Sequence, residues 1–378
     1  MFVSGPVTAR IFRSFETVAE EQELISIADY EAAARARVQP GALAYLDGGA
    51  GDEVTLRDNV AAWGRLAIRP RQLVPVGHRD TAVTVLGNVR PHPLIVAPMA
   101  FQRLAHPAGE AGTARAAAAT GAVMCLSTLA TTTPAALAQA VPEVARWFQV
   151  YVFSDRGVTR ELVAQAVEHG YEALVVTVDL PVLGVREREL RTKVSAPVSE
   201  VHSAAAAGAR GSLTPAEFTA LIDPNLSWAD VERLAAESQL PVIVKGVMTA
   251  EASRLAAAHG VRGLVVSNHG GRQLDTVLSG ADALPEVVEA VGDRLDVLVD
   301  GGIRRGSDVI KALALGARAV MVGRPVLWGL AVAGVQGARR ALEILLAELD
   351  VAMALAGAPK ATDLDSSFLA RAPWSGAP

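Results

Sequence analysis

Residues 267–275, SNHGGRQLD, place a histidine and an arginine three positions apart. The imidazole of His269 can act as a base near neutral pH, and the guanidinium of Arg272 can hold a carboxylate with two hydrogen bonds. The glycines between them permit a tight turn. A lone histidine is more often structural, but one beside an arginine after an apolar run favours proton transfer on a carboxylate-bearing substrate. Asp179, which ends another such run, could orient the imidazole and stabilise its protonated form.

Two glycine-containing turns carry arginines of their own. The segments Asp300-Gly-Gly-Ile-Arg304 and Gly323-Arg324 each follow a β-branched apolar run. Backbone amides in such turns and at a helix N-terminus bind phosphate, and arginine adds positive charge. Neither segment matches a Rossmann fingerprint or a P-loop, so we predict a phosphate site of another kind.

Lys245 ends the apolar run Val242-Ile-Val-Lys245. An ammonium group buried there without a partner would be costly, so we expect an anionic partner. A lysine in this position could form a Schiff base with a substrate, or it could stabilise negative charge on a reduced cofactor. The predicted phosphate site favours the second role.

These polar residues follow a pattern that occurs eight times: a short β-branched apolar run, then polar or glycine residues, then an alanine-rich helical stretch. The pattern is typical of a βα unit whose parallel strand is buried on both faces. The sequence therefore predicts an α/β protein with a closed (β/α)8 TIM barrel, and a doubly wound open sheet is the alternative. The expected strands are 93–99, 123–128, 146–152, 173–179, 241–246, 263–270, 295–302 and 319–325.

All strands of a TIM barrel end at one face, and catalytic residues gather there. Most of the predicted strands end in polar side chains, which we expect to meet in one site. They are Ser127, Thr128, Gln149, Tyr151, Thr177, Asp179, Lys245, Ser267, Asn268, His269, Asp300 and Arg324.

The chain divides into a helical N-terminal part and the barrel. Residues 26–38 form a predicted helix opened by Ser26, and Pro40 begins a second helical segment. We expect residues 1–90 to pack on the barrel and residues 91–378 to contain it.

One connection is too long for a simple crossover. Roughly 60 residues separate the fourth predicted strand from the fifth, so we expect an inserted lid at about 188–228 after strand 4. Residues 335–356 form a predicted amphipathic C-terminal helix.

Composition excludes several classes of protein. The 378 residues include 35 Lys+Arg and 40 Asp+Glu, a net charge of −5 that disfavours nucleic acid and anionic membranes as partners. The single cysteine, Cys125, excludes an intramolecular disulfide and a cysteine zinc cluster, and no two histidines show metal-ligand spacing on one predicted helix. We therefore expect no metal. The first thirty residues lack a signal-peptide pattern, so we expect a cytoplasmic protein.

In their order, these residues resemble the family of FMN-dependent 2-hydroxy acid oxidases and dehydrogenases, which includes glycolate, lactate and mandelate oxidases. The resemblance runs from about residue 26 to residue 357. Its motifs are ALAY at 42–45 with Asp52, APMAFQ at 97–102, FQVY at 148–151, TVD at 177–179, KG at 245–246, the segment 267–275, DGGIR at 300–304 and GR at 323–324.

The resemblance implies an FMN cofactor and the residues around it. Lys245 would lie beside the polar edge of the flavin ring, and Ser267 beside the ribityl chain. The other residues implied to contact the ring, the ribityl chain or the phosphate are Pro98, Met99, Ala100, Ser127, Gln149, Thr177, Asp300, Gly302, Arg304, Gly323 and Arg324.

The resemblance also implies catalytic residues and a product. His269 would remove a proton from the substrate while two electrons pass to the flavin, and Asp179 would support the imidazolium. The product would be a 2-oxo acid, and a homotetramer is expected because it is common in this family. The substrate carboxylate and hydroxyl would be held by Tyr45, Tyr151, Arg186 and Arg272.

The expected reaction is that of an oxidase, with O2 reduced to H2O2, because no haem-binding domain precedes the barrel and the insertion is too polar for a membrane anchor. Leu129 stands where glycolate oxidases of the family carry a tryptophan, and Phe101 lies in a stretch similar to bacterial mandelate oxidases. We therefore expect a bulky or aromatic, mandelate-like (S)-2-hydroxy acid as substrate. The alternatives are a lactate- or glycolate-type oxidase, a dehydrogenase with a non-oxygen acceptor, another FMN barrel enzyme, and a barrel that binds a ligand without catalysis.

Overall fold

The computed structural model describes residues 24–194, 196–197, 203 and 207–375. Parts of the predicted N-terminal region and of the predicted lid therefore lie outside the described residues. Within the described part of the chain, no helix is both long and apolar enough to span a membrane.

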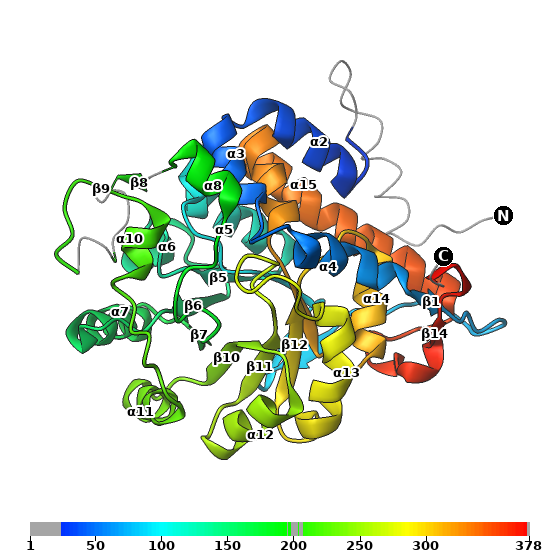
Figure 1. The fold of residues 1–378 in the computed structure, drawn as a ribbon. Coiled ribbons are helices and arrows are strands. Elements are labelled where there is room, and N and C mark those ends of the chain that lie inside the picture. Colours follow the sequence, from blue (N-terminus) through cyan, green and yellow to red (C-terminus); the bar gives the residue numbers. More distant parts are fainter. Residues whose placement is uncertain (1–23, 195, 198–202, 204–206, 376–378) are drawn as a thin grey trace.

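Eight parallel strands close into a barrel, with helices around it (Figure 1). Each strand pairs with the next barrel strand in chain order, and the last strand pairs with the first. The predicted TIM barrel is confirmed, and the open-sheet alternative is wrong. The strands are β4 (Leu94–Val96), β5 (Val123–Leu126), β6 (Arg146–Val150), β7 (Leu174–Thr177), β10 (Val242–Val247), β11 (Gly263–Val266), β12 (Asp296–Asp300) and β13 (Ala319–Val322).

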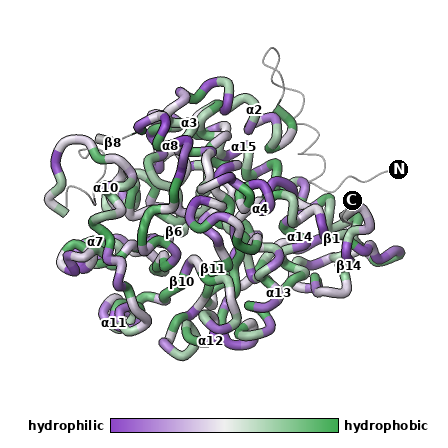
Figure 2. The backbone as a smooth tube through the Cα atoms, in the orientation of Figure 1, coloured by the Kyte–Doolittle hydropathy of each residue, from purple (hydrophilic) through white to green (hydrophobic). Residues whose placement is uncertain are grey.

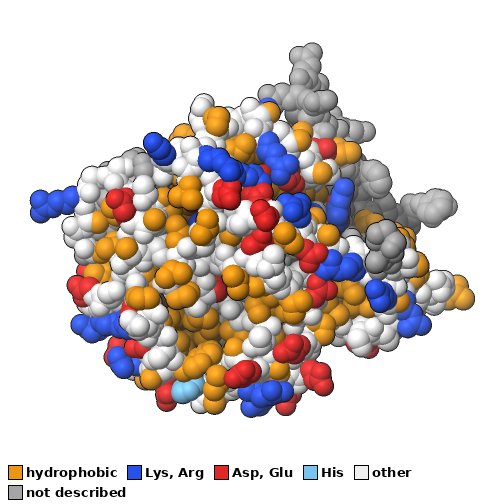
Figure 3. All heavy atoms as spheres, in the orientation of Figure 1, with side chains coloured by type: hydrophobic (Ala, Val, Ile, Leu, Met, Phe, Trp, Pro, Cys, Tyr) orange, Lys and Arg blue, Asp and Glu red, His pale blue; other side chains and the backbone are white. Residues whose placement is uncertain are grey.

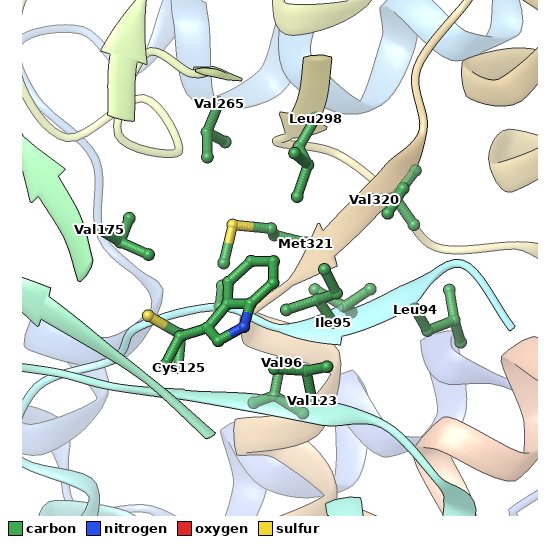
Figure 4. Packing of buried hydrophobic residues seen from close by; sticks show 14 of the residues in the cluster. Leu94, Ile95, Val96, Val123, Cys125, Val175, Val265, Leu298, Val320 and Met321 are labelled. Atoms are coloured by element: carbon green, nitrogen blue, oxygen red, sulfur yellow. The ribbon is translucent and has the colours of Figure 1, made fainter. Parts of the chain in front are cut away.

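The barrel strands are apolar because both of their faces are buried. Every residue of β5, β7, β11 and β13 is buried. Figure 4 shows side chains from several strands packed together in this core, among them Val175, Val265, Leu298 and Met321. Cys125 is part of the same cluster, as its apolar surroundings in the sequence predict.

Helices follow the strands and cover the outside of the barrel. In Figure 2 they alternate hydrophilic and hydrophobic stretches, as expected for helices with one buried face. They are α5 (Gly109–Thr120), α6 (Pro134–Ala140), α7 (Arg156–Glu168), α11 (Trp228–Ser238), α12 (Ala250–Ala258), α13 (Gly280–Val291) and α14 (Gly306–Ala314).

From residue 24 onward, three helices precede the barrel: α2 (Ile27–Arg37), α3 (Pro40–Asp47) and α4 (Val54–Gly64). The capping box between Ser26 and Asp29 is present at the start of α2, as the sequence predicts. Helices α2 and α3 pack against the C-terminal helix α15 (Figure 1).

Helix α15 (Arg324–Ala356) is longer than the predicted helix at 335–356. Its backbone is non-helical at Ala333 and Gly334, where a φ of 57° and a ψ of −135° at the glycine break the helix. The predicted helix is the second half, and the first half was missed because it begins directly at the end of β13. Across the break the backbones of Gly329 and Gly337 approach so closely that neither position has room for a side chain.

Short elements complete the fold. Helices α8 (Glu187–Thr192) and α10 (Pro215–Thr219) belong to the long insertion. On the face seen in Figure 3, acidic and basic side chains are interspersed. Small antiparallel sheets pair β1 (Leu66–Ile68) with β14 (Leu369–Arg371), β2 (Val83–Val85) with β3 (Asn88–Arg90), and β8 (Ala196–Pro197) with β9 (Ser212–Leu213). Short 3-10 turns occur at Gln102–Leu104, Ala361–Asp363, Ser366–Phe368 and Pro373–Ser375.

Gly337→Ala tests the close approach within α15. The new Cβ would lie 2.0 Å from the carbonyl oxygen of Gly329, so the two halves of the helix must separate. We expect a loss of about 2 kcal/mol of stability, the range typical of overpacking, seen as a lower Tm in thermal denaturation. Gly64→Ala is the control, because a Cβ at Gly64 meets no atom within 4 Å. Equal Tm values for the two variants would contradict the expectation.

Candidate active site

A cavity of about 1190 Å³, its open mouth included, lies at the carboxyl ends of the barrel strands. Residues at or just after the end of every barrel strand line it, which is where a TIM barrel places its chemistry. Four of the residues predicted to meet here do not line the cavity: Thr128, Asp179, Ser267 and Asn268. The first three bond to residues that do, whereas the Asn268 side chain bonds to Asn59 of α4. The predicted residues that line it are Tyr45, Pro98, Met99, Ala100, Phe101, Ser127, Leu129, Gln149, Tyr151, Thr177, Arg186, Lys245, His269, Arg272, Asp300, Gly302, Arg304, Gly323 and Arg324.

His269 and Asp179 form a pair beside the cavity. Nδ1 of His269 lies 2.8 Å from Oδ1 of Asp179, so the second ring nitrogen, Nε2, is the one that remains for a substrate. The backbone N–H of His269 donates to Oγ of Ser267 at 3.1 Å. His269 has a φ of 58°, a conformation that side chains other than glycine adopt at a cost, and such strain is concentrated at functional sites.

The environment sets the charges of this pair. Burial lowers the pKa of His269 from its ordinary value of 6.5, and although Asp179 acts to raise it, the net shift is downward. Burial raises the pKa of Asp179, but the attraction of His269 and its hydrogen bond outweigh burial and leave that pKa lowered. A neutral imidazole beside a carboxylate is therefore the resting state, which is the arrangement a general base needs.

Gly246 makes room for Asp179. The register of β10 against β11 shifts between Lys245 and Val247, and Gly246 has a φ of 108°. A Cβ at this glycine would lie 2.6 Å from Cβ of Asp179. Position 246 therefore requires glycine for steric reasons, which the sequence alone did not reveal.

Arg186 and Arg272 lie together at the cavity, and both are largely buried. Nε of Arg186 donates to the carbonyl oxygen of Arg272 at 2.9 Å. The Arg272 guanidinium lies over the ring of Tyr45, 4.9 Å from its centroid, and Nη1 donates to the Tyr45 carbonyl at 2.6 Å. Burial, followed by repulsion from Arg272, lowers the pKa of Arg186. The two predicted carboxylate-binding arginines are therefore adjacent, although they are far apart in sequence.

Tyr45 and Tyr151 are also buried at the cavity. Burial raises the pKa of both phenols, so both hydroxyls stay protonated and can donate hydrogen bonds. The ring of Tyr45 packs against Phe101 at a centroid distance of 5.2 Å.

Lys245 has the anionic partner that its burial requires. Its Nζ lies 3.3 Å from Oδ2 of Asp300 and donates to Oγ of Ser267 at 2.9 Å. Burial would lower the pKa of Lys245, but attraction to Asp300 and then to Asp179 reverses the direction and raises it. A Schiff base needs a neutral amine, so this environment favours the role of a fixed positive charge.

Three polar side chains from neighbouring strands form a connected group in the cavity wall. Oγ of Ser127 donates to Oε1 of Gln149 at 3.2 Å, and Nε2 of Gln149 donates to Oγ1 of Thr177 at 3.1 Å. Because all three also line the cavity, they can offer hydrogen bonds to a polar ring edge.

The ends of β12 and β13 hold polar atoms that lack partners. Oδ1 of Asp300 and Nε of Arg324 are buried and have no hydrogen-bond partner among the described residues. Burial, with repulsion from Arg272 and Arg304, lowers the pKa of Arg324 to about 9. Buried polar atoms without partners are costly, so a ligand with hydroxyl groups and a negative charge would complete this part of the site. The Cβ that Gly302 lacks would lie 1.7 Å from the Asn59 carbonyl oxygen, which shows how tightly this turn packs on α4.

The other end of the cavity is apolar. Tyr151, Leu180 and Ile222 form a small buried cluster against which Leu129 and Leu183 pack. Phe101 packs against Phe218 of α10 at a centroid distance of 5.7 Å. The long insertion therefore supplies part of the cavity wall, through Pro215 and Thr219 of α10.

Sequence reasoning missed several residues of the site. Glu189 contacts both cavity arginines, at 3.4 Å from Nη1 of Arg186 and 3.1 Å from Nη2 of Arg272. Its position three residues after Arg186, within a charged run, was the available signal. The remaining lining residues that were missed are Leu46, Ala97, Leu180, Leu183, Pro215, Thr219, Gly270, Gly301, Ile303, Met321, Val322, Pro325 and Leu327.

Comparisons with known proteins agree with this geometry. The model of the FMN-dependent dehydrogenase family matches residues 34–371. The L-lactate oxidase of Nostoc sp. is 45% identical over 358 residues, covering 91% of this chain and 98% of that protein. A mandelate oxidase variant solved with (S)-mandelic acid is 39% identical at a TM-score of 0.83, covering 92% of this chain and 98% of that chain. A soluble mutant of the membrane-associated (S)-mandelate dehydrogenase of Pseudomonas putida is 33% identical at a TM-score of 0.86, covering 93% and 100%.

The residues at the ends of β12 and β13 fit FMN. Asp300 offers an acceptor that ribityl hydroxyls can satisfy, and Arg324 offers an unpaired donor to a phosphate. Arg304 and the turns at Gly302 and Gly323 supply further charge and backbone amides.

Arg304→Ala tests the phosphate assignment. Loss of a charge-assisted hydrogen bond should weaken FMN binding by about tenfold to a hundredfold. Riboflavin lacks the phosphate, so its affinity should change little; flavin fluorescence quenching measures both. Arg305→Ala is the control, because the Arg305 side chain is half exposed and pairs with Glu348. Equal losses for FMN and riboflavin would contradict the assignment.

Proposed function

The chain belongs to the FMN-dependent dehydrogenase family, and from that premise we propose that it oxidises a bulky or aromatic (S)-2-hydroxy acid to the 2-oxo acid, with O2 reduced to H2O2. The family assignment makes the protein an FMN-dependent oxidoreductase of the 2-hydroxy acid oxidase and dehydrogenase type. The choice of substrate and of electron acceptor is the proposal.

His269 and Asp179 perform the proton transfer in this proposal. Nε2 of the neutral imidazole accepts a proton from the substrate, and the Asp179 carboxylate at 2.8 Å from Nδ1 stabilises the imidazolium that forms. FMN, when bound, takes up the two electrons that leave the substrate and passes them to the acceptor. Lys245, held protonated by Asp300, supplies positive charge in the same cavity.

The substrate carboxylate is bound by Arg186 and Arg272. Each guanidinium has five N–H donors, and each uses three of its hydrogens in the hydrogen bonds described among the residues of this structure. The remaining donors can bind a carboxylate without breaking those bonds. The hydroxyl groups of Tyr45 and Tyr151 donate hydrogen bonds to the carboxylate and to the hydroxyl oxygen of the substrate.

The apolar end of the cavity carries the proposed substrate class. Leu129, Leu180 and Leu183 line the cavity and belong to one apolar cluster, and they can bury an aromatic or branched substituent on the 2-carbon. The mandelate oxidase structure with (S)-mandelic acid supports this choice. The L-lactate oxidase relative supports a second candidate, a small 2-hydroxy acid. Because another similar structure is that of a mandelate dehydrogenase, a non-oxygen electron acceptor is the alternative to O2.

An anaerobic absorbance titration of the holoenzyme tests the proposal. We expect (S)-mandelate to bleach the flavin band faster than lactate or glycolate, and (R)-mandelate to leave it unchanged. Admission of air should restore the band quickly and produce H2O2. Faster bleaching by lactate would mean that the substrate is a small 2-hydroxy acid and not a bulky one. Slow recovery of the flavin band in air would indicate a dehydrogenase.

Leu129→Trp is the matched variant for this titration. The indole should fill the apolar end of the cavity, so kcat/KM for (S)-mandelate should fall at least tenfold more than kcat/KM for glycolate, because overpacking excludes the larger substituent first. A parallel fall for both substrates would mean that Leu129 does not contact the substituent.

Asp179→Asn tests the base and its partner through pH. Wild-type kcat/KM should fall on acidification with an apparent pKa below 6.5, because burial lowers the pKa of His269 and the protonated ring cannot accept a proton. The carboxylate of Asp179 raises that pKa, so its removal should move the acid limb to still lower pH. The plateau should also drop by about a hundredfold, because the imidazolium loses its stabilising charge.

His269→Ala is the control for this profile. It should retain FMN and show no acid limb, with flavin reduction nearly abolished. An acid limb that persists in this variant, or one that moves upward in Asp179→Asn, would remove His269 from the role of base.

A further inference from the structure

Glu189 lies behind the two arginines that face the cavity. Its side chain is 6% exposed, equal to that of Arg186, and the Arg272 side chain is 13% exposed. One oxygen, Oε1, receives both contacts, from Nη1 of Arg186 and from Nη2 of Arg272. This carboxylate therefore joins the two guanidinium groups, which otherwise repel one another.

The second carboxylate oxygen of Glu189 argues against a purely structural role. Oε2 is buried and has no hydrogen-bond partner among the described residues. A buried carboxylate that served only stability would be expected to satisfy both oxygens, because an unpaired one costs free energy. An incompletely satisfied charge is more typical of a site that is completed by function.

Charge arithmetic indicates what that function is. Two guanidinium groups carry +2, and Glu189 reduces the charge of this arginine clamp, Arg186 with Arg272 and Glu189, to +1. One bound carboxylate then brings the clamp to neutrality, whereas the second carboxylate of a dianion carries a charge that the clamp does not offset. Uncompensated buried charge is strongly unfavourable, so the clamp's net charge can discriminate between ligands of the same shape.

We propose that Glu189 is a specificity-determining positioning residue that matches the arginine clamp to a single carboxylate and selects against dianions. The proposal rests on the function proposed above, in which Arg186 and Arg272 bind the substrate carboxylate. It predicts that the clamp binds a monoanion more tightly than a dianion of the same shape, whatever the substituent. Glu189 itself acts through the arginines and holds them in register.

Oxamate and oxalate test the proposal, because they have nearly the same shape and carry one and two negative charges. The dissociation constants of both anions are measured on oxidised holoenzyme from the change in the flavin absorbance spectrum, without turnover. Glu189→Gln keeps the shape of the side chain and raises the clamp charge to +2. We expect the affinity ratio of oxalate to oxamate to rise about tenfold or more in this variant, in keeping with the strength of charge interactions at a few ångströms in a partly buried site.

Three further variants complete the test. Glu187→Gln makes the same change on the same helix at a half-exposed carboxylate that pairs with Arg191, and its ratio should equal that of the wild type. Glu189→Asp keeps the charge, so its ratio should also stay near that of the wild type. Glu189→Ala removes the same charge and leaves room for water, and it replaces Glu189→Gln if that variant does not retain FMN.

The outcomes separate this proposal from the proposed function. Equal losses of affinity for both anions in Glu189→Gln, with an unchanged ratio, would mean that Glu189 is structural and would overturn the proposal alone. A wild-type holoenzyme that is reduced by no 2-hydroxy acid would overturn the proposed function, whatever the ratio. A ratio that rises in Glu187→Gln as well would show a general surface-charge effect and would overturn the assignment to Glu189.

Discussion

The cavity at the mouth of the barrel contains an excess of buried positive charge, which its ligands and neighbouring residues must offset. Five cationic side chains line the cavity, and Asp300 is the one carboxylate among the described residues that line it with them; the cations are Arg186, Lys245, Arg272, Arg304 and Arg324. Burial of like charges is unfavourable, and the lowered pKa values of Arg186 and Arg324 record that cost. Carboxylates behind the cavity, such as Asp179 and Glu189, offset part of it. In the proposed function, a phosphate and a carboxylate offset the rest.

The residues proposed to bind these two anions follow different strands of the barrel. In the barrel β7 and β11 flank β10, and β12 and β13 follow as neighbours. Arg186 and Arg272 come from the chain after β7 and β11, so Lys245 at the end of β10 stands on the strand between them. Arg304 and Arg324 follow β12 and β13. In the proposed function, the phosphate and the substrate carboxylate therefore bind to residues from different strands of one barrel. The two groups of residues adjoin, because Arg272 and Arg324 both donate to the carbonyl oxygen of Gly48.

The barrel itself could be predicted because its strands are buried on both faces. A run such as LVVT at 174–177 has no polar residue until its end. Both the strand and the residues that follow it can therefore be recognised in the sequence. Asp179, Lys245 and His269 were found in this way. The expected homotetramer stays a prediction, because the structure contains a single chain. The expected cytoplasmic location also stays a prediction.

The parts that could not be predicted have a common physical reason. Helix α10 and the leucines Leu180 and Leu183 lie in a connection without a clear period, so no repeat indicated that they wall the cavity. The partner of the arginines, Glu189, depends on how a six-residue helix sits against Arg272, which is a tertiary contact. The first half of α15 was missed because it begins directly at the end of β13, and the break at Gly334 depends on how the two halves of the helix pack.

The base itself shows why such contacts matter more than residue types. His269 has a backbone conformation that is unfavourable for its side chain, and three contacts hold it there: the bond to Ser267, the bond to Asp179 and the tight packing of Asp179 on Gly246. The imidazole is therefore oriented before a substrate arrives, and the strain is borne by the barrel rather than by the binding energy of the substrate. Ser267 also bonds to Lys245, so the same hydroxyl that fixes the base fixes the cation beside it. Ser267, predicted to contact the cofactor, thus joins the neutral base and the cation on which the proposed chemistry depends.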